Sequence, residues 1–198
     1  MQIGRAAPVE RADAARNRGR ILDAATRLFQ RHGVSAVSMD QIAVEAAVGK
    51  GTLFRRFGSK AGLAAALLDA REQALQGPIL SGPPPLGPGA PAADRLRAFF
   101  AAYTRFLEEN LDLVHMSETA DAGARYRVGA YRFWHQHVRL LLTEARPDLD
   151  ADFLAHALLA PLAADLRQAT RAGYSADRVE TGLGSLIELV LTGNPTRK

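Results

Sequence analysis

Residues 46–60, AAVGKGTLFRRFGSK, hold the densest group of side chains that can bind phosphate. Lys50 lies between two glycines, and Arg55 and Arg56 follow within two helical turns. Lysine and arginine pair with phosphate oxygens, and glycine lets a backbone approach a ligand closely. The segment therefore predicts phosphate binding, on a nucleotide or on a nucleic-acid backbone.

The spacing of the glycines argues against a nucleotide. A P-loop needs glycine five positions before its Gly-Lys pair and a serine or threonine after it. Val44 and Gly51 occupy those two positions. A dinucleotide-binding turn would need a βαβ unit, and no strand pattern surrounds this segment.

The elements around the segment favour a duplex. Ser38, with Gln41 three residues later, predicts a capping box at the start of a helix from Met39 to about Ala46. A tight turn at 47–49 then leads into a short helix ending at Phe57. Two short helices joined by a turn, the second one basic, form the helix-turn-helix arrangement.

The helical spacing divides the second short helix into two faces. Leu53 and Phe57 lie four residues apart and are expected to pack inward. The outer side and flanks then carry the polar and basic residues of the helix, which are Lys50, Thr52, Arg55 and Arg56.

The charge of the chain is uneven along its length. Residues 1–60 contain 11 Lys and Arg against 5 Asp and Glu, whereas residues 61–198 contain 14 against 16. The net charge of +4 therefore comes from the first third, which suggests either a polyanion-binding module or a basic solvated surface.

Residues 16–63 also resemble the N-terminal domain of the TetR family of transcriptional regulators. The matching segments are ILDAATRLF, SMDQIAVEA, the VGKGTLFRRF helix and the SKAGL that follows. The resemblance implies an all-α, homodimeric repressor whose three-helix N-terminal domain binds double-stranded operator DNA. The larger C-terminal domain would dimerise through its last two long helices and bind an unknown small-molecule effector.

The resemblance also assigns DNA contacts. It implies that Ser38 and Lys60 touch phosphate and that Lys50, Gly51 and Thr52 approach the groove. It further implies backbone or base contacts from Phe54 and Arg55, beside the basic Arg56.

Three positions depart from the family pattern, and they leave the base specificity undetermined. Phe54 stands where a phosphate-binding tyrosine is common. Ala47 stands where glycine is common, and a left-handed backbone there would cost about 1–2 kcal/mol. Gly49 stands where a serine-type N-cap is common, at a cost of only about a few tenths of a kcal/mol.

We expect two domains, 1–58 for DNA binding and 59–198 for regulation, with residues 1–13 as a flexible arm. Helical periodicity predicts helices over about 14–32, 60–76, 92–109, 125–145, 151–172 and 175–192, with Pro161 kinking or dividing the fifth. Residues 77–91 contain four glycines and six prolines, so we expect no helix there. They form a loop or, alternatively, a proline-rich ligand.

The second domain is rich in aromatic residues at helical spacing. These side chains either fill a core or line an effector pocket. The candidates for a pocket are Phe99, Tyr103, His115, Met116, Tyr131, Trp134 and His137.

The last helices carry apolar repeats that suit either a dimer interface or internal packing. Leu154, Leu158, Leu162 and Leu166 recur every four residues, and Leu183, Leu186, Ile187, Val190 and Leu191 form a second apolar face.

The sequence predicts no catalytic set, no metal site and no cofactor. His135 and His137 are two apart and point in different directions on a helix, and His115 and His156 are isolated in sequence. Cysteine is absent, which excludes thiolate ligands and cysteine nucleophiles. The alternative function is that of a helical small-molecule-binding protein or enzyme with an incidental basic N-terminal domain.

The sequence also bears on location. No long apolar run predicts a membrane span, and no secretory signal is present. We therefore expect a cytoplasmic protein with no membrane partner.

Overall fold

The computed structural model describes residues 8–119, 123–127 and 129–193. Every regular element among them is a helix. The chain divides into two compact units, Met1–Leu68 and Asp69–Lys198. No helix of the described residues is long and apolar enough to cross a membrane.

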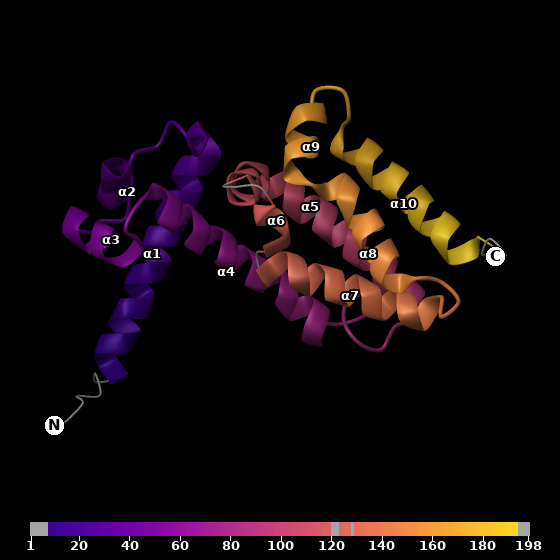
Figure 1. The fold of residues 1–198 in the computed structure, drawn as a ribbon. Coiled ribbons are helices and arrows are strands. Elements are labelled where there is room, and N and C mark those ends of the chain that lie inside the picture. The colour runs from indigo at the N-terminus through magenta and orange to yellow at the C-terminus, as the bar shows by residue number, and fades with distance from the viewer. Residues whose placement is uncertain (1–7, 120–122, 128, 194–198) are drawn as a thin grey trace. The chain divides into compact units, whose positions relative to one another are not determined.

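Unit 1 is a three-helix assembly followed by the start of a fourth helix (Figure 1). Its helices are α1 (Pro8–His32), α2 (Met39–Glu45) and α3 (Lys50–Phe57), and α4 (Lys60–Ser81) begins within it. Helix α1 starts six residues before the expected position, so residues 8–13 of the predicted arm are helical. Residues 1–7 of that arm lie outside the described part of the chain.

The core of unit 1 follows the predicted periodicity. Ile21, Ala25, Ile42, Leu53 and Leu63 are each at most 5% exposed and come from all four helices. Serines start two of the helices, because Ser38 caps α2 and Ser59 Oγ accepts a hydrogen bond from Gly62 N–H at the start of α4.

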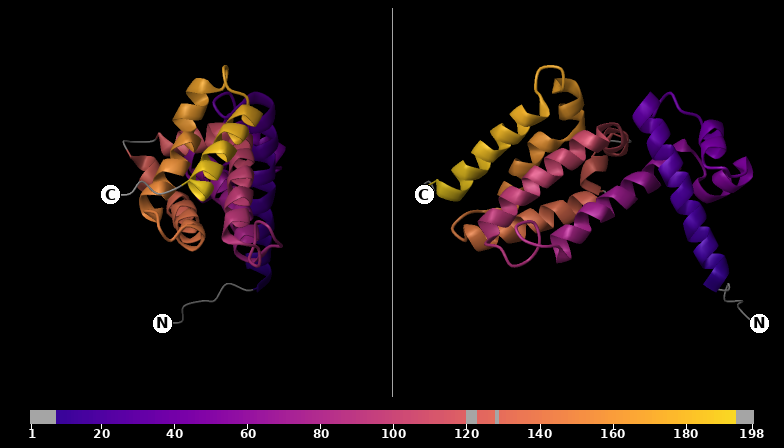
Figure 2. Two further views of the ribbon diagram at one scale, coloured as in Figure 1. Left: turned by 90° about the vertical axis from the view of Figure 1, so that its right-hand side faces the viewer. Right: turned by 180° about the vertical axis from the view of Figure 1, so that it is seen from behind.

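Unit 2 contains the rest of α4 and all later helices. These are α5 (Ala92–Glu118), α6 (Ala124–Arg127), α7 (Gly129–Ala145), α8 (Ala151–Leu159), the 3-10 turn η1 (Ala160–Leu162), α9 (Ala164–Thr170) and α10 (Ala176–Thr192). Helix α5 lies against α7, α9 and α10, and α8 lies along α7 (Figure 2). Pro161 lies within η1, which separates α8 from α9 and so divides the long helix as predicted.

Two helices of unit 2 differ from the prediction. Helix α4 continues through Gly77 and Pro78 to Ser81, so the loop begins at residue 82 rather than 77. Ile79 is 1% exposed, and its carbonyl accepts from Arg95 Nη2 at 3.4 Å, so burial holds this last turn in place despite the proline.

Helix α5 is also longer than predicted, with an interruption at Asn110. The backbone of Asn110 is non-helical, with φ −123° and ψ 15°. Its side-chain amide donates to Phe106 O at 2.7 Å, which satisfies a carbonyl that the distortion frees. The helix predicted over 92–109 therefore continues past a kink at Asn110 to Glu118.

Candidate nucleic-acid interface

The capping box predicted at Ser38 is present. Gln41 N–H donates to Ser38 Oγ at 3.2 Å, and Ser38 N–H donates to Gln41 Oε1 at 2.8 Å. Ser38 itself is exposed, so its hydroxyl stays at the surface at the N-terminus of α2. The two reciprocal bonds fix the start of the helix-turn-helix.

The turn between α2 and α3 has the left-handed backbone that the sequence analysis anticipated. Ala47 has φ 52°, and its N–H donates to Val44 O at 3.0 Å. Val48 N–H donates to Ala43 O at 3.0 Å and closes the turn. Gly49 caps α3 with no side-chain hydrogen bond, because it has no side chain to offer.

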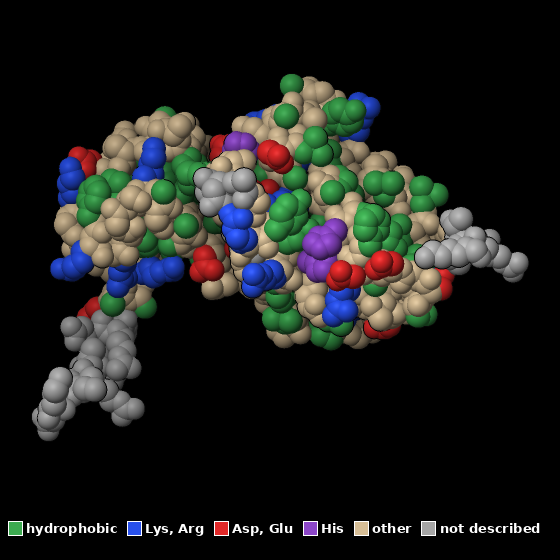
Figure 3. Space-filling model, viewed as in Figure 1, with side chains coloured by type: hydrophobic (Ala, Val, Ile, Leu, Met, Phe, Trp, Pro, Cys, Tyr) green, Lys and Arg blue, Asp and Glu red, His purple; other side chains and the backbone are tan. Residues whose placement is uncertain are grey.

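Helix α3 has one buried residue and a largely exposed polar surface. Leu53 is fully buried, and Phe57 is partly buried beside it. Thr52 is partly buried, and the exposed positions are Lys50, Gly51, Phe54, Arg55 and Arg56. Figure 3 shows basic side chains over the surface of this unit. The division into faces that spacing predicted is therefore present.

Lys50 is held by two neighbours at the start of α3. Its Nζ lies 2.8 Å from Asp40 Oδ1 and 5.9 Å from the centre of the Phe54 ring. Both charged side chains are 62% exposed, so solvent screens the pair and leaves the lysine free to exchange partners. Phe54 is itself 39% exposed and forms an apolar spot beside the ammonium.

The two arginines of α3 differ in their partners. Arg56 Nη1 donates to Ala14 O on α1, so this guanidinium joins α3 to α1. Arg55 makes no hydrogen bond or ion pair with any described residue and is exposed. Arg55 therefore has its full donor set available to an external anion.

Lys60 forms hydrogen bonds within the protein. Its Nζ donates to Val34 O, Ser35 O and Val37 O at 2.9–3.0 Å, and an ammonium has three N–H groups. The bonds tie the start of α4 to the loop between α1 and α2. A phosphate contact from Lys60 would require giving up at least one of them.

In unit 2, four of the residues expected to bind an effector form a packed aromatic cluster. Phe99 lies 5.7 Å from Tyr103, 6.0 Å from Trp134 and 5.2 Å from His137, measured between ring centres. All four are at most 9% exposed. The sequence left two alternatives for these residues, a packed core or an effector pocket. Their burial and close ring contacts are those of a core.

The other three candidates are Tyr131, His115 and Met116. Tyr131 contacts His135 and His156 through its ring, and its hydroxyl lies 2.7 Å from His156 Nδ1. His115 and Met116 are partly buried near the end of α5. Four of the seven candidates therefore pack together as one aromatic cluster.

His137 is the polar member of the aromatic cluster. Burial lowers the pKa of its imidazole to about 4, and the positive charge of Arg95 adds to this, so the ring is neutral at pH 7. Its Nε2 is buried with no hydrogen-bond partner among the described residues. Buried polar atoms without a partner are uncommon in native structures.

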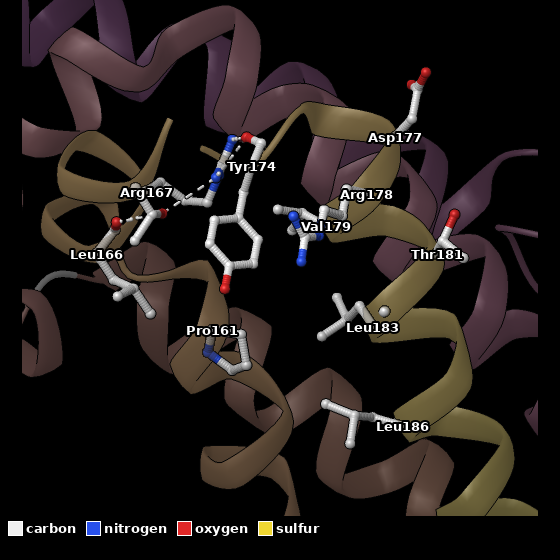
Figure 4. Close-up of a pocket in the computed structure, with 12 residues that line it drawn as sticks. Pro161, Leu166, Arg167, Tyr174, Asp177, Arg178, Val179, Thr181, Leu183 and Leu186 are labelled. Atoms are coloured by element: carbon white, nitrogen blue, oxygen red, sulfur yellow. Dashed lines mark hydrogen bonds between the residues drawn. The ribbon is translucent and has the colours of Figure 1, made fainter. Parts of the chain in front are cut away.

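A cavity of about 760 Å³ lies between α9 and α10, away from the predicted set (Figure 4). Pro161, Leu166, Leu183 and Leu186 supply much of its apolar lining. The Tyr174 ring extends into it with the hydroxyl toward Pro161. Its polar lining residues include Thr170, Asp177, Arg178 and Thr181. Its volume is typical of a small-molecule site.

No motif marks this cavity in the sequence. Its lining comes from η1, α9, the following loop and α10. The sequence indicated only that the chain changes direction at Pro161.

Comparison with known proteins identifies unit 1. Residues 21–67 match the family described as bacterial regulatory proteins, tetR family. An HTH-type transcriptional regulator of Staphylococcus aureus (strain USA300) is 47% identical over 53 residues. That match spans 27% of this chain and 29% of the relative, so it covers less than a third of either protein.

Solved structures extend the similarity over most of the chain. A putative transcriptional regulator from Saccharomonospora viridis, in complex with choline, has a TM-score of 0.70 and 25% identity, covering 88% of this chain and 96% of that one. A TetR-like transcriptional regulator from Rhodococcus sp. RHA1 has a TM-score of 0.64 and 22% identity, covering 90% and 97%. The second of these likenesses shows the fold alone.

Proposed function

Because the chain belongs to the TetR family of bacterial regulatory proteins, we propose that it is a transcriptional regulator whose unit 1 binds operator DNA. The exposed surface of α3 carries this proposal. Arg55 is unpaired among described residues, Lys50 has only a solvent-screened partner, and Phe54 and Thr52 lie beside them. Cations of this kind neutralise phosphates, and the N-terminal part of a recognition helix contacts base edges.

The eight residues predicted to bind DNA divide into groups by their present contacts. Lys50, Gly51, Thr52, Phe54 and Arg55 form the groove-facing set. Ser38 adds a hydroxyl at the N-terminus of α2, where helix N–H groups favour phosphate. Arg56 and Lys60 act first on the protein, since each already donates to backbone carbonyls.

We propose that the regulator is a homodimer, since a two-fold pair of recognition helices fits two half-sites about one helical turn apart. Helix α10 has two apolar faces that support this. Leu183 and Ile187 are buried, whereas Leu186 is 45% and Leu189 68% exposed. Only the outward face is available to a partner subunit.

We also propose that the protein is a repressor released by a small-molecule effector, which binds in the cavity between α9 and α10. The Saccharomonospora viridis protein of similar fold is in complex with choline, which supports a small-molecule site for this chain. Leu166 and Leu186 line the cavity and are also exposed, so an occupant would contact the proposed dimer surface. The effector would thereby favour one dimer arrangement over another.

The alternative of an enzyme or carrier is not favoured. The similar proteins are named transcriptional regulators, and the family match falls within unit 1. Unit 2 would need convergent catalytic groups, and the candidates there pack as a core.

Selection of bound sequences from a random DNA pool, followed by footprinting, tests the proposed function. We expect a palindromic site. Enrichment of no sequence would overturn DNA recognition, and enrichment of a single half-site would overturn the dimer.

Two variants then separate the phosphate contact from the structural cation. Arg55→Ala is expected to weaken DNA binding and to lower the slope of log affinity against log salt by about one unit. Lys60→Met is expected to lower thermal stability while leaving the salt slope unchanged. A slope change with Lys60→Met would instead make Lys60 a phosphate ligand.

Filling the cavity tests the effector site. Gly182 lines it, and a Cβ at this position meets no atom within 4 Å, so Gly182→Leu can occupy the space without a backbone clash. Gly182→Ala is the matched control, because it makes the same helix-propensity gain with little added volume. We expect the effector to release DNA from the alanine variant and not from the leucine variant. If the effector releases DNA from both variants, this cavity is not the effector site.

A further inference from the structure

Three side chains with metal-binding groups meet on the outer surface of α7 and α8. His135 lies on α7, and Asp152 and His156 lie on α8. One ligand atom from each lies within 4.8 Å of the others. Figure 3 shows histidine and acidic side chains side by side on this face of unit 2.

The packing of α7 against α8 brings these residues together, although His156 is isolated in the sequence. Asp152 and His156 are four residues apart, so both lie on one face of α8. The His135 and His156 rings are 3.9 Å apart between centres, and His135 Nε2 lies 3.7 Å from Asp152 Oδ1. Expecting isolated histidines from sequence spacing was therefore wrong for this pair.

The start of α8 is fixed by its own contacts. Asp150 caps the helix, and its Oδ1 accepts from Phe153 N–H at 3.1 Å. Asp152 thus lies in the first helical turn with its carboxylate toward solvent, 70% exposed and able to turn.

A neighbouring tyrosine orients one of the imidazoles. Tyr131 is 6% exposed, and its hydroxyl lies 2.7 Å from His156 Nδ1 with the two rings stacked at 5.9 Å. In the metal-bound form the Nδ1–H of His156 donates to the Tyr131 oxygen, which leaves the lone pair of Nε2 for the metal. Metal-binding histidines characteristically have their second ring nitrogen held by such a partner.

We propose that His135, His156 and Asp152 form a binding site for a divalent transition-metal ion of the zinc class. Two imidazoles and one carboxylate suit Zn²⁺, Co²⁺ or Ni²⁺, whereas Mg²⁺ and Ca²⁺ prefer oxygen ligands. Three protein ligands leave the fourth tetrahedral position for water or another small ligand.

Small side-chain rotations complete the geometry. Metal–ligand bonds of about 2.0–2.2 Å place tetrahedral ligand atoms roughly 3.4 Å apart, so the three groups must draw closer from their present separation. His135 Nε2 must also release its contact with Asp152 O, now 3.2 Å away, and carry its proton on Nδ1. The bound ion would join α7 to α8 and stabilise the folded unit by mass action.

Metal titration of the untagged full-length chain, stripped with a chelator, tests the site. We expect one Zn²⁺ per chain, and Co²⁺ absorption bands of a four-coordinate nitrogen–oxygen site, with neither Mg²⁺ nor Ca²⁺ competing. Tyr131→Phe should weaken Zn²⁺ binding by about 10-fold, as loss of an orienting partner does, and His135→Gln or His156→Gln by more than that.

His32→Gln is the matched control, because His32 is an exposed histidine in unit 1 and outside the cluster. It should leave Zn²⁺ affinity unchanged. Equal Zn²⁺ binding by the His32, His135 and His156 variants, or no binding by the parent chain, would overturn the proposal. If a histidine variant fails to fold, Asp152→Asn replaces it, because Asp152 is exposed. Unchanged Zn²⁺ affinity in Asp152→Asn would also overturn the proposal.

Discussion

The two units of the chain use their cations in opposite ways. In unit 1, Lys50 and Arg55 lie at the surface with a screened partner or none among the described residues. In unit 2, Arg125 and Arg167 are buried, at 6% and 2% exposure, and each pairs with a glutamate. Similar residue types thus serve recognition in one unit and folding in the other.

The difference follows from the cost of removing charge from water. An exposed lysine or arginine keeps its hydration, and its ion pairs contribute little to stability, so it can change partners when an anion approaches. A buried guanidinium must form its hydrogen bonds and ion pairs inside the protein, so it is not available to an external ligand. Availability for a ligand therefore depends on burial more than on residue type.

Glu118 and Arg125 show how complete the internal bonding is. Arg125 Nη1 lies 2.6 Å from Glu118 Oε1 and also donates to Leu162 O, while Nη2 donates to Leu159 O. Glu118 Oε2 accepts from Ala164 N–H at 2.8 Å. One ion pair thus joins the end of α5, α6 and the start of α9.

The largest expected effect comes from breaking this pair. Glu118→Ala leaves Arg125 buried without its counter-charge and Ala164 N–H without its acceptor, so we expect a loss of about 3–5 kcal/mol of unfolding free energy. Chemical denaturation measures it. Glu45→Ala, which breaks the solvent-accessible pairs with Arg27 and Arg31 in unit 1, is expected to cost at most about 1 kcal/mol. Equal losses would remove the distinction between the units.

Sequence reasoning succeeded in unit 1 because its determinants are local. The capping box spans four residues, the left-handed turn falls at one position, and the faces of α3 follow from helical spacing. Side-chain orientation along a helix is set by the backbone period, so the sequence is sufficient. It could not show that Lys60 bonds three carbonyls about 25 residues earlier.

Unit 2 was predicted less well because its determinants are distant in sequence. Arg167 pairs with Glu108, which is 59 residues away, and His156 meets His135 only through the packing of two helices. The extension of α4 past Pro78 depends on the burial of Ile79. Helix propensity and periodicity predicted the helices and the break at Pro161. Tertiary contacts determine which polar side chains lie together, and the sequence does not show these contacts.

Glu72 of unit 2 is a half-buried carboxylate whose charged neighbours include two other carboxylates. Burial, with Asp69 and Glu118 nearby, raises the pKa of Glu72 to about 7. The folded state then binds more protons than the unfolded state, so stability is highest below the ordinary glutamate pKa and falls as pH rises to about 7. After discounting for partial exposure, Glu72→Gln should stabilise the protein by about 1–2 kcal/mol at pH 8.

At pH 4.5 and below the same substitution should have little effect, because the carboxyl is then protonated in the folded state. Thermal unfolding across this pH range measures the difference. Glu144→Gln, at an exposed position of unit 2, is the control and should show no comparable pH dependence. A constant effect of Glu72→Gln at every pH would show that charge is not its cause.

In unit 1 the unfavourable feature is a strained backbone conformation at Ala47 rather than a buried charge. Ala47 has φ 52° and an exposed side chain, so Ala47→Gly relieves the strained conformation without leaving a cavity. We expect a stabilisation of about 0.5–1 kcal/mol, after the entropic cost of glycine. Ala46→Gly, at a buried right-handed position next to it, should destabilise by at least as much, and effects of one sign in both would contradict this account.

The smallest expected effect tests whether the surface cation of unit 1 is free to change partners. Asp40 holds Lys50 in the absence of DNA, and a phosphate must displace it. Asp40→Asn should therefore raise DNA affinity by about two- to three-fold and steepen the salt dependence by up to about one unit, because Lys50 then pairs with phosphate alone. Asp23→Asn makes the same change of net charge at an exposed position on α1. If Asp23→Asn raises DNA affinity as much as Asp40→Asn does, the gain comes from net charge. Release of Lys50 from Asp40 then contributes nothing to DNA binding.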